Sequence, residues 1–169
     1  KVWLLVGVGL MMASSGPVST SPEDPLDVWG SAEPEFTFVR LIYSGGNFRR
    51  GSSWATDYPK ADRQFLYALR KLTDFSFINA TGKAIPIMSE ELFQYPFVYA
   101  VEVGYMRLST EEAARLREYL LRGGFLVVDD FHGEYEWNNF YSQLEKVFPE
   151  YVPEESPVSH PVYQGYLEI

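Results

Sequence analysis

Acidic residues and a histidine stand where apolar, strand-like runs of this chain end. Glu102 follows one such run, and Asp129, Asp130 and His132 follow another. The carboxyl ends of the strands in an open parallel sheet share one edge, so we expect these side chains to gather at a ligand-binding edge. Such a group can hold a hard cation, bind a metal through mixed Asp and His ligands, or carry out acid/base hydrolysis.

The same residues have purely structural explanations. Asp129 and Asp130 can cap a turn or the next helix, and His132 can make a structural hydrogen bond. The chain has only two histidines, His132 and His160, and it has no cysteine, so a multi-histidine or thiolate metal signature is absent from the sequence. The residues therefore leave open whether this edge is catalytic and whether it holds a metal or another cofactor.

A second group of residues lies in a segment that leads into a predicted helix, where loops often carry function. Trp54 and Tyr58 can form a stacking wall, with polar contacts from Asp57 and Arg63. Together with Tyr105 at the sheet edge, this composition suits a sugar or another polar small molecule. In the alternative interpretation, Asp57 caps the helix and Trp54 covers the edge of the sheet.

The periodicity of apolar residues predicts the elements that must position both groups. Strands are expected over residues 36–43, 84–88, 97–103 and 125–129, and helices over 58–73, 109–122 and 137–148. Ser109 and Glu112 have the spacing of a capping box at the start of the second helix. Because strands alternate with helices, the expected fold is α/β, with a Rossmann-like, mostly parallel sheet and helices on both faces.

Length and charge limit the class of protein further. The 169 residues, 46% of them hydrophobic, can bury the core of one domain. The formal net charge of -9 provides no basic field to attract phosphate backbones. We therefore expect no nucleic-acid partner, and a cationic or neutral ligand is easier to accommodate than an anionic one.

The amino-terminal segment has the pattern of an export signal. The run from Val2 to Ala13 is apolar but too short to span a bilayer, and small residues follow it at Ala13-Ser14-Ser15. We expect residues 1–15 to be the visible part of a signal peptide, 16–34 a linker rich in Pro, Ser and acidic residues, and 35–169 the α/β domain. The protein is then exported to the periplasm or cell envelope, with no transmembrane span beyond this signal. The alternative is a retained anchor.

Three stretches resemble a known family pattern: WATDYPKAD at 54–62, LLRGGFLVVDDFHG at 120–133 and HPVY at 160–163. They resemble the bacterial family known as domain of unknown function 4159, over residues 36–169. That family is similar in fold to class I glutamine amidotransferases and to ThuA-like proteins. Its members are often exported or membrane-attached, and are encoded near MoxR-type ATPases and von Willebrand A-like proteins.

The resemblance implies an amidotransferase-like scaffold, a domain that continues past residue 169, and an envelope protein complex as a partner. No established activity comes with it. Amidotransferases attack glutamine with a cysteine thiolate, and the chain has no cysteine, so we expect no glutaminase activity. The leading hypothesis is a noncatalytic, extracytoplasmic binding or assembly domain. The alternative is a hydrolase, with or without a metal, that uses Asp129, Asp130 and His132 together with Glu102.

Overall fold

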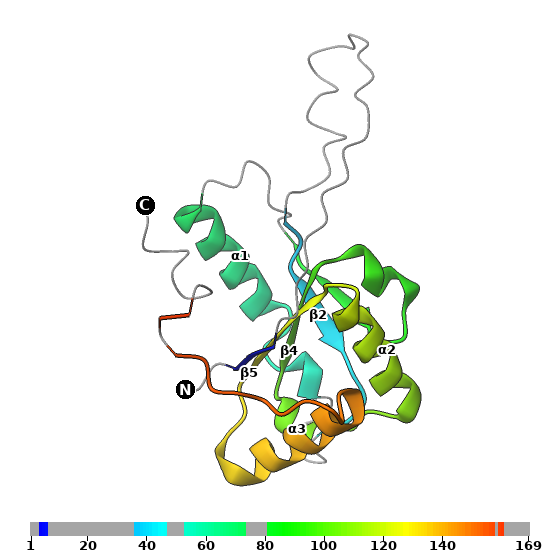
Figure 1. The fold of residues 1–169 in the computed structure, drawn as a ribbon. Coiled ribbons are helices and arrows are strands. Elements are labelled where there is room, and N and C mark those ends of the chain that lie inside the picture. Colours follow the sequence, from blue (N-terminus) through cyan, green and yellow to red (C-terminus); the bar gives the residue numbers. More distant parts are fainter. Residues whose placement is uncertain (1–3, 7–35, 47–52, 74–80, 158, 161–169) are drawn as a thin grey trace.

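Four parallel strands form the centre of the molecule, which a computed structural model describes over residues 4–6, 36–46, 53–73, 81–157 and 159–160. Across the sheet their order is β5 (Phe125–Asp129), β4 (Phe97–Val101), β2 (Val39–Ile42) and β3 (Lys83–Pro86). A short strand, β1 (Leu4–Val6), pairs with the outer edge of β5 in the antiparallel direction (Figure 1). The expected α/β fold with a mostly parallel sheet is confirmed.

Strand β1 belongs to the apolar run that we interpret as a signal peptide. Leu4 pairs with Val128 and Val6 with Leu126, so this segment covers backbone groups that β5 otherwise presents at the edge of the sheet. Residues 1–3 and the whole range 7–35 lie outside the described residues. The signal peptide and the linker therefore stay predictions.

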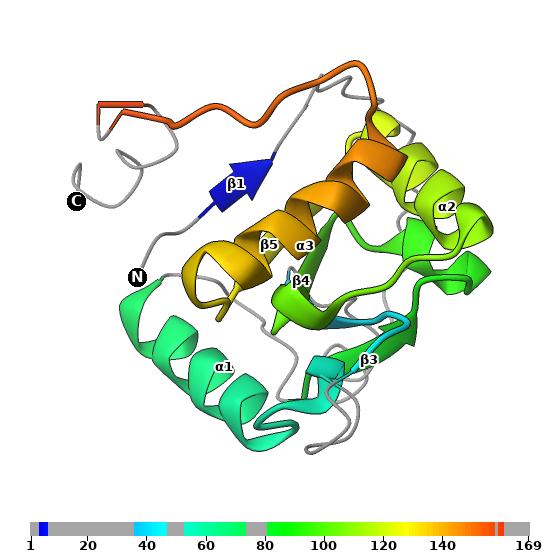
Figure 2. The same cartoon turned by 90° about the horizontal axis from the view of Figure 1, so that it is seen from below.

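Helices cover both faces of the sheet. Helix α1 (Lys60–Leu72) lies on one face, and α2 (Thr110–Leu121) and α3 (Gly133–Val147) lie on the other (Figures 1 and 2). In the part of the chain that the structure describes, no helix is long and apolar enough to cross a bilayer. The three predicted helices are all present, and each follows a strand of the parallel sheet.

The main hydrophobic core lies between the sheet and the α2/α3 layer. Alternate strand residues point to this side, among them Leu41, Val98 and Val128, and they pack in one buried cluster with Leu116 of α2 and Phe140 of α3. This alternation is the period of two that a strand imposes on its side chains. One face of every central strand is thus fully used by the core.

The opposite face of the sheet is covered less completely. Phe38 and Leu66 form a small buried cluster between β2 and α1. Of the other apolar residues whose spacing predicts this helix, Phe65 is 44% exposed and Leu72 is 55% exposed. Helix α1 is thus amphipathic in sequence, but it buries only a narrow apolar stripe against the strands.

Two helix starts show how local polar contacts set the boundaries. The capping box predicted for α2 is confirmed: the Glu112 N–H donates to Ser109 Oγ (3.1 Å), and the Ser109 N–H donates to Glu112 Oε2 (2.8 Å). Helix α3 begins at Gly133 rather than at the predicted residue 137. Its first turn is polar, and Glu136 Oε2 accepts a bond from the His132 N–H (2.6 Å). Apolar periodicity cannot detect a helical turn of this kind.

Tyr43, just after β2, is buried and joins the carboxyl ends of β2 and β4. Its hydroxyl donates to backbone carbonyls, with the oxygen 2.6 Å from Val101 O and 3.0 Å from Glu102 O. Burial, aided by the Glu102 carboxylate, raises the pKa of Tyr43 above its usual value. The folded protein therefore holds the phenol proton more tightly than the unfolded chain does.

We predict that this tyrosine makes the protein less stable at alkaline pH. A folded-state pKa above the unfolded value gives stability that is complete below about pH 10 and is lost as the pH rises towards the folded pKa. In Tyr43→Phe, the fall of unfolding free energy above pH 10 should be shallower by up to about 1.4 kcal/mol per pH unit. Urea unfolding across this range measures the slope. Tyr135→Phe, at a 75% exposed position, should keep the parent slope; identical slopes for the parent and Tyr43→Phe would contradict the prediction.

Candidate functional site

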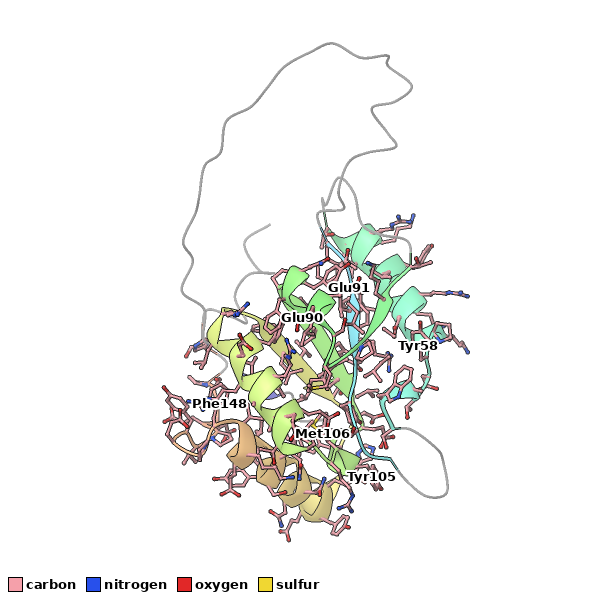
Figure 3. The ribbon with its side chains drawn as sticks, turned by 90° about the vertical axis from the view of Figure 1, so that its right-hand side faces the viewer. Tyr58, Glu90, Glu91, Tyr105, Met106 and Phe148 are labelled. Carbon is pink, nitrogen blue, oxygen red and sulfur yellow. The ribbon has the colours of Figure 1, made fainter. Side chains whose placement is uncertain are left out.

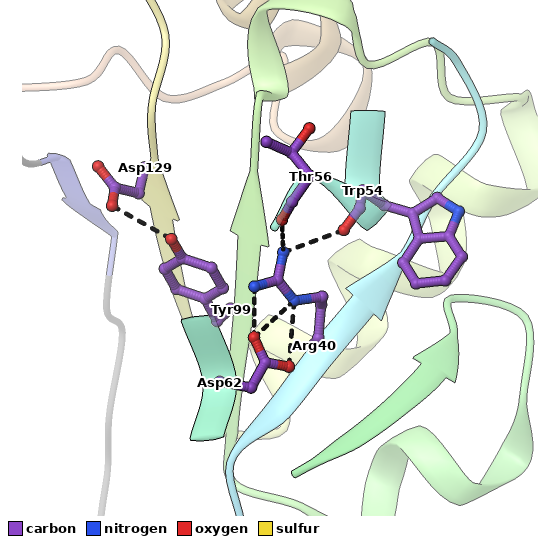
Figure 4. A network of polar contacts seen from close by, with 6 residues as sticks. All are labelled: Arg40, Trp54, Thr56, Asp62, Tyr99 and Asp129. Carbon is purple, nitrogen blue, oxygen red and sulfur yellow. Dashed lines mark hydrogen bonds and ion pairs between the residues drawn. The ribbon is translucent and has the colours of Figure 1, made fainter. Parts of the chain in front are cut away.

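Arg40 of β2 is the centre of a buried polar network that the sequence analysis missed. Arg40 is 1% exposed, and its Nε lies 3.0 and 3.2 Å from the two carboxylate oxygens of Asp62 in α1. Its Nη2 also bonds to this carboxylate, while Nη1 donates to the backbone oxygens of Trp54 (3.1 Å) and Thr56 (3.0 Å) (Figure 4). A buried guanidinium needs a countercharge and acceptors, and this arrangement supplies both.

Two tyrosine rings lie against the same guanidinium. Its Cζ is 5.8 Å from the ring centroid of Tyr58 and 5.3 Å from that of Tyr99, within the range of cation–π contacts. The Tyr99 hydroxyl donates to Asp129 Oδ2 (3.1 Å). Burial, followed by the charge of Asp129, raises the pKa of Tyr99, so its hydroxyl stays protonated at neutral pH. The network runs from α1 through β2 and β4 to β5, as Figure 4 shows.

The predicted ligand-binding loop is held in place by this network. The rings of Trp54 and Tyr58 are adjacent, with centroids 5.8 Å apart and ring planes tilted by 56°. Trp54 also packs against the main core, and Tyr58 covers Arg40. Both rings therefore have structural contacts, and Tyr58, which is 38% exposed, presents part of its surface to solvent.

The interpretation of Asp57 as a helix cap is wrong. The N-cap position of α1 is occupied by Pro59, and no side chain caps the helix there. Asp57 is exposed, has a left-handed backbone with φ of 56°, and accepts a bond from the Ala61 N–H (2.9 Å) through its backbone oxygen. The first turn of α1 thus receives a backbone acceptor from the loop, and the Asp57 carboxylate is not the group that caps it.

The other two residues assigned to the ligand site, and His160 of the third motif, come from separate parts of the chain. Arg63 is exposed on α1. Tyr105 is half-buried in the short 3-10 helix η3 (Val103–Tyr105), and Figure 3 places it apart from Tyr58. His160 is exposed and its N–H donates to Pro157 O (2.8 Å), while the rest of the HPVY stretch lies outside the described residues. Within the predicted ligand group, Trp54 and Tyr58 are in ring contact.

At the strand ends, the predicted catalytic residues are linked mainly through backbone groups. The Glu102 N–H donates to Asp129 O (3.0 Å), and Asp129 Oδ1 accepts a bond from the Asp130 N–H (2.7 Å). Asp130 Oδ1 lies 3.3 Å from Nε2 of His132, whose side chain is 70% exposed. Among the described residues, no group of three or more His, Cys, Asp or Glu side chains is arranged to hold a metal ion.

Left-handed backbone marks this edge of the sheet. Asp57, Glu102 and Asp130 have φ of 56°, 56° and 60°, and each lies in a connection that follows a strand of the parallel sheet. Such a conformation is uncommon for residues other than glycine and persists where the surrounding contacts determine it. Two residues after Glu102 the packing is tight, because a Cβ on Gly104 would lie 2.4 Å from Cβ of Glu136. The sharp turns are therefore built into the fold.

We predict that two aspartates of this region differ strongly in their contribution to stability. Asp62→Asn removes the countercharge of a buried guanidinium and should lower the unfolding free energy by about 3–5 kcal/mol. Asp130→Asn keeps a side chain that tolerates left-handed backbone, and both it and His132→Ala should change the free energy by no more than about 0.5 kcal/mol. Urea unfolding at neutral pH measures all three. If Asp130→Asn lowers the unfolding free energy as much as Asp62→Asn does, the exposed residues after β5 stabilise the fold and the prediction is wrong.

Comparison with known proteins identifies the family but no activity. The model of a family described as a domain of unknown function (DUF4159) matches residues 37–168. No curated protein matches the chain. The match includes the loop from Trp54 to Asp62 and the strand end at Asp129, so it confirms the resemblance seen in the sequence motifs. The chain belongs to the DUF4159 family.

Proposed function

We propose that this chain is a noncatalytic, extracytoplasmic binding domain that keeps an amidotransferase-like scaffold without its chemistry. The observation that carries the proposal is the way in which the charged residues of the site are used. Arg40 and Asp62 neutralise each other in the interior, and Asp129 accepts bonds from Tyr99 and from the backbone of Asp130. The charged groups of Arg40, Asp62 and Asp129 thus bond to other parts of the protein, as is typical of residues that hold a binding surface in shape.

A hydrolase needs a nucleophile or an activated water, a base within reach, and a group that orients the base. Asp130 and His132 are the residues closest to this requirement, with 3.3 Å between Oδ1 and Nε2. Their contact favours a hydrolase as the second candidate function. It lies in solvent, however, with the His132 side chain 70% exposed, so little of the protein excludes water from it.

Binding is favoured by a cavity on the α1 side of the sheet. The cavity has a volume of about 270 Å³ and is bordered by α1, β2, β4 and β5. Aromatic and aliphatic side chains form most of its wall, and a few polar groups lie among them, which is the usual composition of a small-molecule site. A small ligand with an apolar part fits this description better than the sugar or other polar small molecule expected from the loop residues alone.

We predict that the purified protein has no hydrolytic turnover at this edge. Parent protein and the His132→Ala variant should hydrolyse p-nitrophenyl esters, phosphates and glycosides at the same background rate, with or without Zn²⁺, Mg²⁺ or Mn²⁺. The variant is the matched control because it removes the only imidazole at this edge within the described part of the chain. Turnover by the parent that His132→Ala abolishes would favour the hydrolase and refute the noncatalytic proposal.

The extracytoplasmic location is the second part of the proposal. It is supported by the apolar run from Val2 to Ala13, by the small residues that follow it, and by the Pro-rich stretch beyond. The envelope protein complex implied by family resemblance is a proposed partner on the same grounds. Cleavage after Ser15 would also remove β1 and leave the outer edge of β5 without the pairing described above.

We predict that the mature protein begins at Gly16. Amino-terminal sequencing of protein recovered from the periplasm or envelope fraction of the producing bacterium tests this start. A matched variant in which Leu4, Leu5 and Val6 are replaced by aspartate should remain uncleaved in the cytoplasm, because the signal would lose its apolar centre. Protein that reaches the envelope with Lys1 still attached would contradict the cleavage prediction.

A further inference from the structure

The cavity on the α1 side has walls that are mainly aromatic. Phe65 of α1 packs beside Phe38, the residue before β2, with ring centroids 4.9 Å apart. Phe97 and Tyr99 of β4 lie next to the Phe38 ring, at 5.9 and 5.3 Å. Val127 of β5 completes this apolar lining. Phe65 is 44% exposed, so the aromatic wall remains open to solvent on one side. Such a surface accepts a flat or short apolar group.

The polar residues of the cavity differ in how much bonding capacity remains to them. Arg40 and Asp62 are 1% and 2% exposed and are neutralised by each other. Asp129 is half-buried, and each of its two carboxylate oxygens accepts one bond within the protein, from Tyr99 and from the Asp130 N–H. A carboxylate has about four lone-pair positions, so Asp129 can still accept further bonds from a ligand.

The net charge of the lining residues is therefore negative and belongs to Asp129, the last residue of β5. The guanidinium of Arg40 is paired inside the protein, and Asp129 is followed directly by a second acid, Asp130. The chain as a whole carries a formal net charge of -9. An anionic ligand would meet repulsion here, whereas a cation would meet both a carboxylate and aromatic faces that attract it.

We infer that this cavity binds a small organic cation, with its apolar part against Phe38, Phe65 and Phe97 and its ammonium group on the carboxylate of Asp129. The inference rests on the proposed binding function and specifies its ligand class. The volume of about 270 Å³ suits one ring with a short substituent. The site would select ligands in which the distance between the apolar part and the ammonium group lets the ammonium reach Asp129 of β5.

The test compares three ligands of similar shape by isothermal titration calorimetry at neutral pH: benzylammonium, benzyl alcohol and benzoate. The full chain should bind benzylammonium at least about ten times more tightly than benzyl alcohol, and benzoate least of all. In Asp129→Asn this preference for the cation should fall to within about twofold. The substitution keeps the shape of the side chain and removes only its charge.

Two further variants make the result specific. Glu145→Gln removes one negative charge from an exposed position of α3, on the other face of the sheet from the cavity, and should keep the preference for benzylammonium. Phe65→Ala removes part of the exposed wall and should weaken benzylammonium and benzyl alcohol by the same factor. Circular dichroism melts establish that each variant is folded. If Asp129→Asn is not folded, the affinities of the parent for benzylammonium and benzyl alcohol decide, because equal binding of the two overturns the inference.

The inference is overturned if benzylammonium and benzyl alcohol bind the parent equally, if neither binds, or if Glu145→Gln lowers the preference as much as Asp129→Asn does. These outcomes leave the noncatalytic proposal untouched, because that proposal fails only when turnover is found. Conversely, turnover that depends on His132 would refute the noncatalytic proposal but would not change the ligand preference measured for the cavity.

Discussion

A single guanidinium in the interior determines how the α1 side of this domain is built. Arg40 is almost completely buried within an otherwise apolar strand, where an unpaired charge would be strongly destabilising. The structure satisfies it from three directions: Asp62 comes from α1, two backbone oxygens come from the loop before α1, and the rings of Tyr58 and Tyr99 lie beside it. The position of the loop and of the helix therefore follows from the requirements of one side chain.

This constraint also produces the cavity. Because Asp62 must reach Arg40, the first turns of α1 are held over β2, and the cavity lies between this helix and the exposed-side residues of β4 and β5. Tyr99 extends the network across β4 and ends it on Asp129. The buried pair and the half-buried carboxylate of Asp129, which can accept a ligand, thus line the same cavity.

The sequence predicted those elements whose signals are local. The strand at 125–129 agrees with β5, and the capping box of Ser109 and Glu112 forms as its spacing indicates. The start of α3 was missed because its first turn is polar and is stabilised by Glu136 rather than by apolar packing alone. The cap assigned to Asp57 was wrong because the chain bends left-handed there and Pro59 takes the N-cap position.

The main residue of the site could not be found in this way. An arginine inside an apolar run is equally compatible with a strand edge and with a buried ion pair, and its partner Asp62 lies 22 residues away in the sequence. Asp62 was part of a recognisable motif, WATDYPKAD, but its spacing relative to Arg40 has meaning only after the strand and the helix are packed. Local patterns identify elements, whereas charge pairing between elements depends on the tertiary fold.

The two neighbouring acids at the end of β5 show why the predicted catalytic group divides in two. Asp129 keeps the strand alternation, faces α1 together with Val127, and lines the cavity. Asp130 adopts left-handed backbone and turns the chain out of the sheet, so its carboxylate meets the exposed His132 instead. Because of this one change of backbone conformation, the Asp129 carboxylate lines the apolar pocket, whereas the Asp130 carboxylate lies beside a solvent-exposed histidine. Chemistry that required both acids on one substrate would have to bridge these two environments, whereas a ligand held by Asp129 alone needs only the pocket.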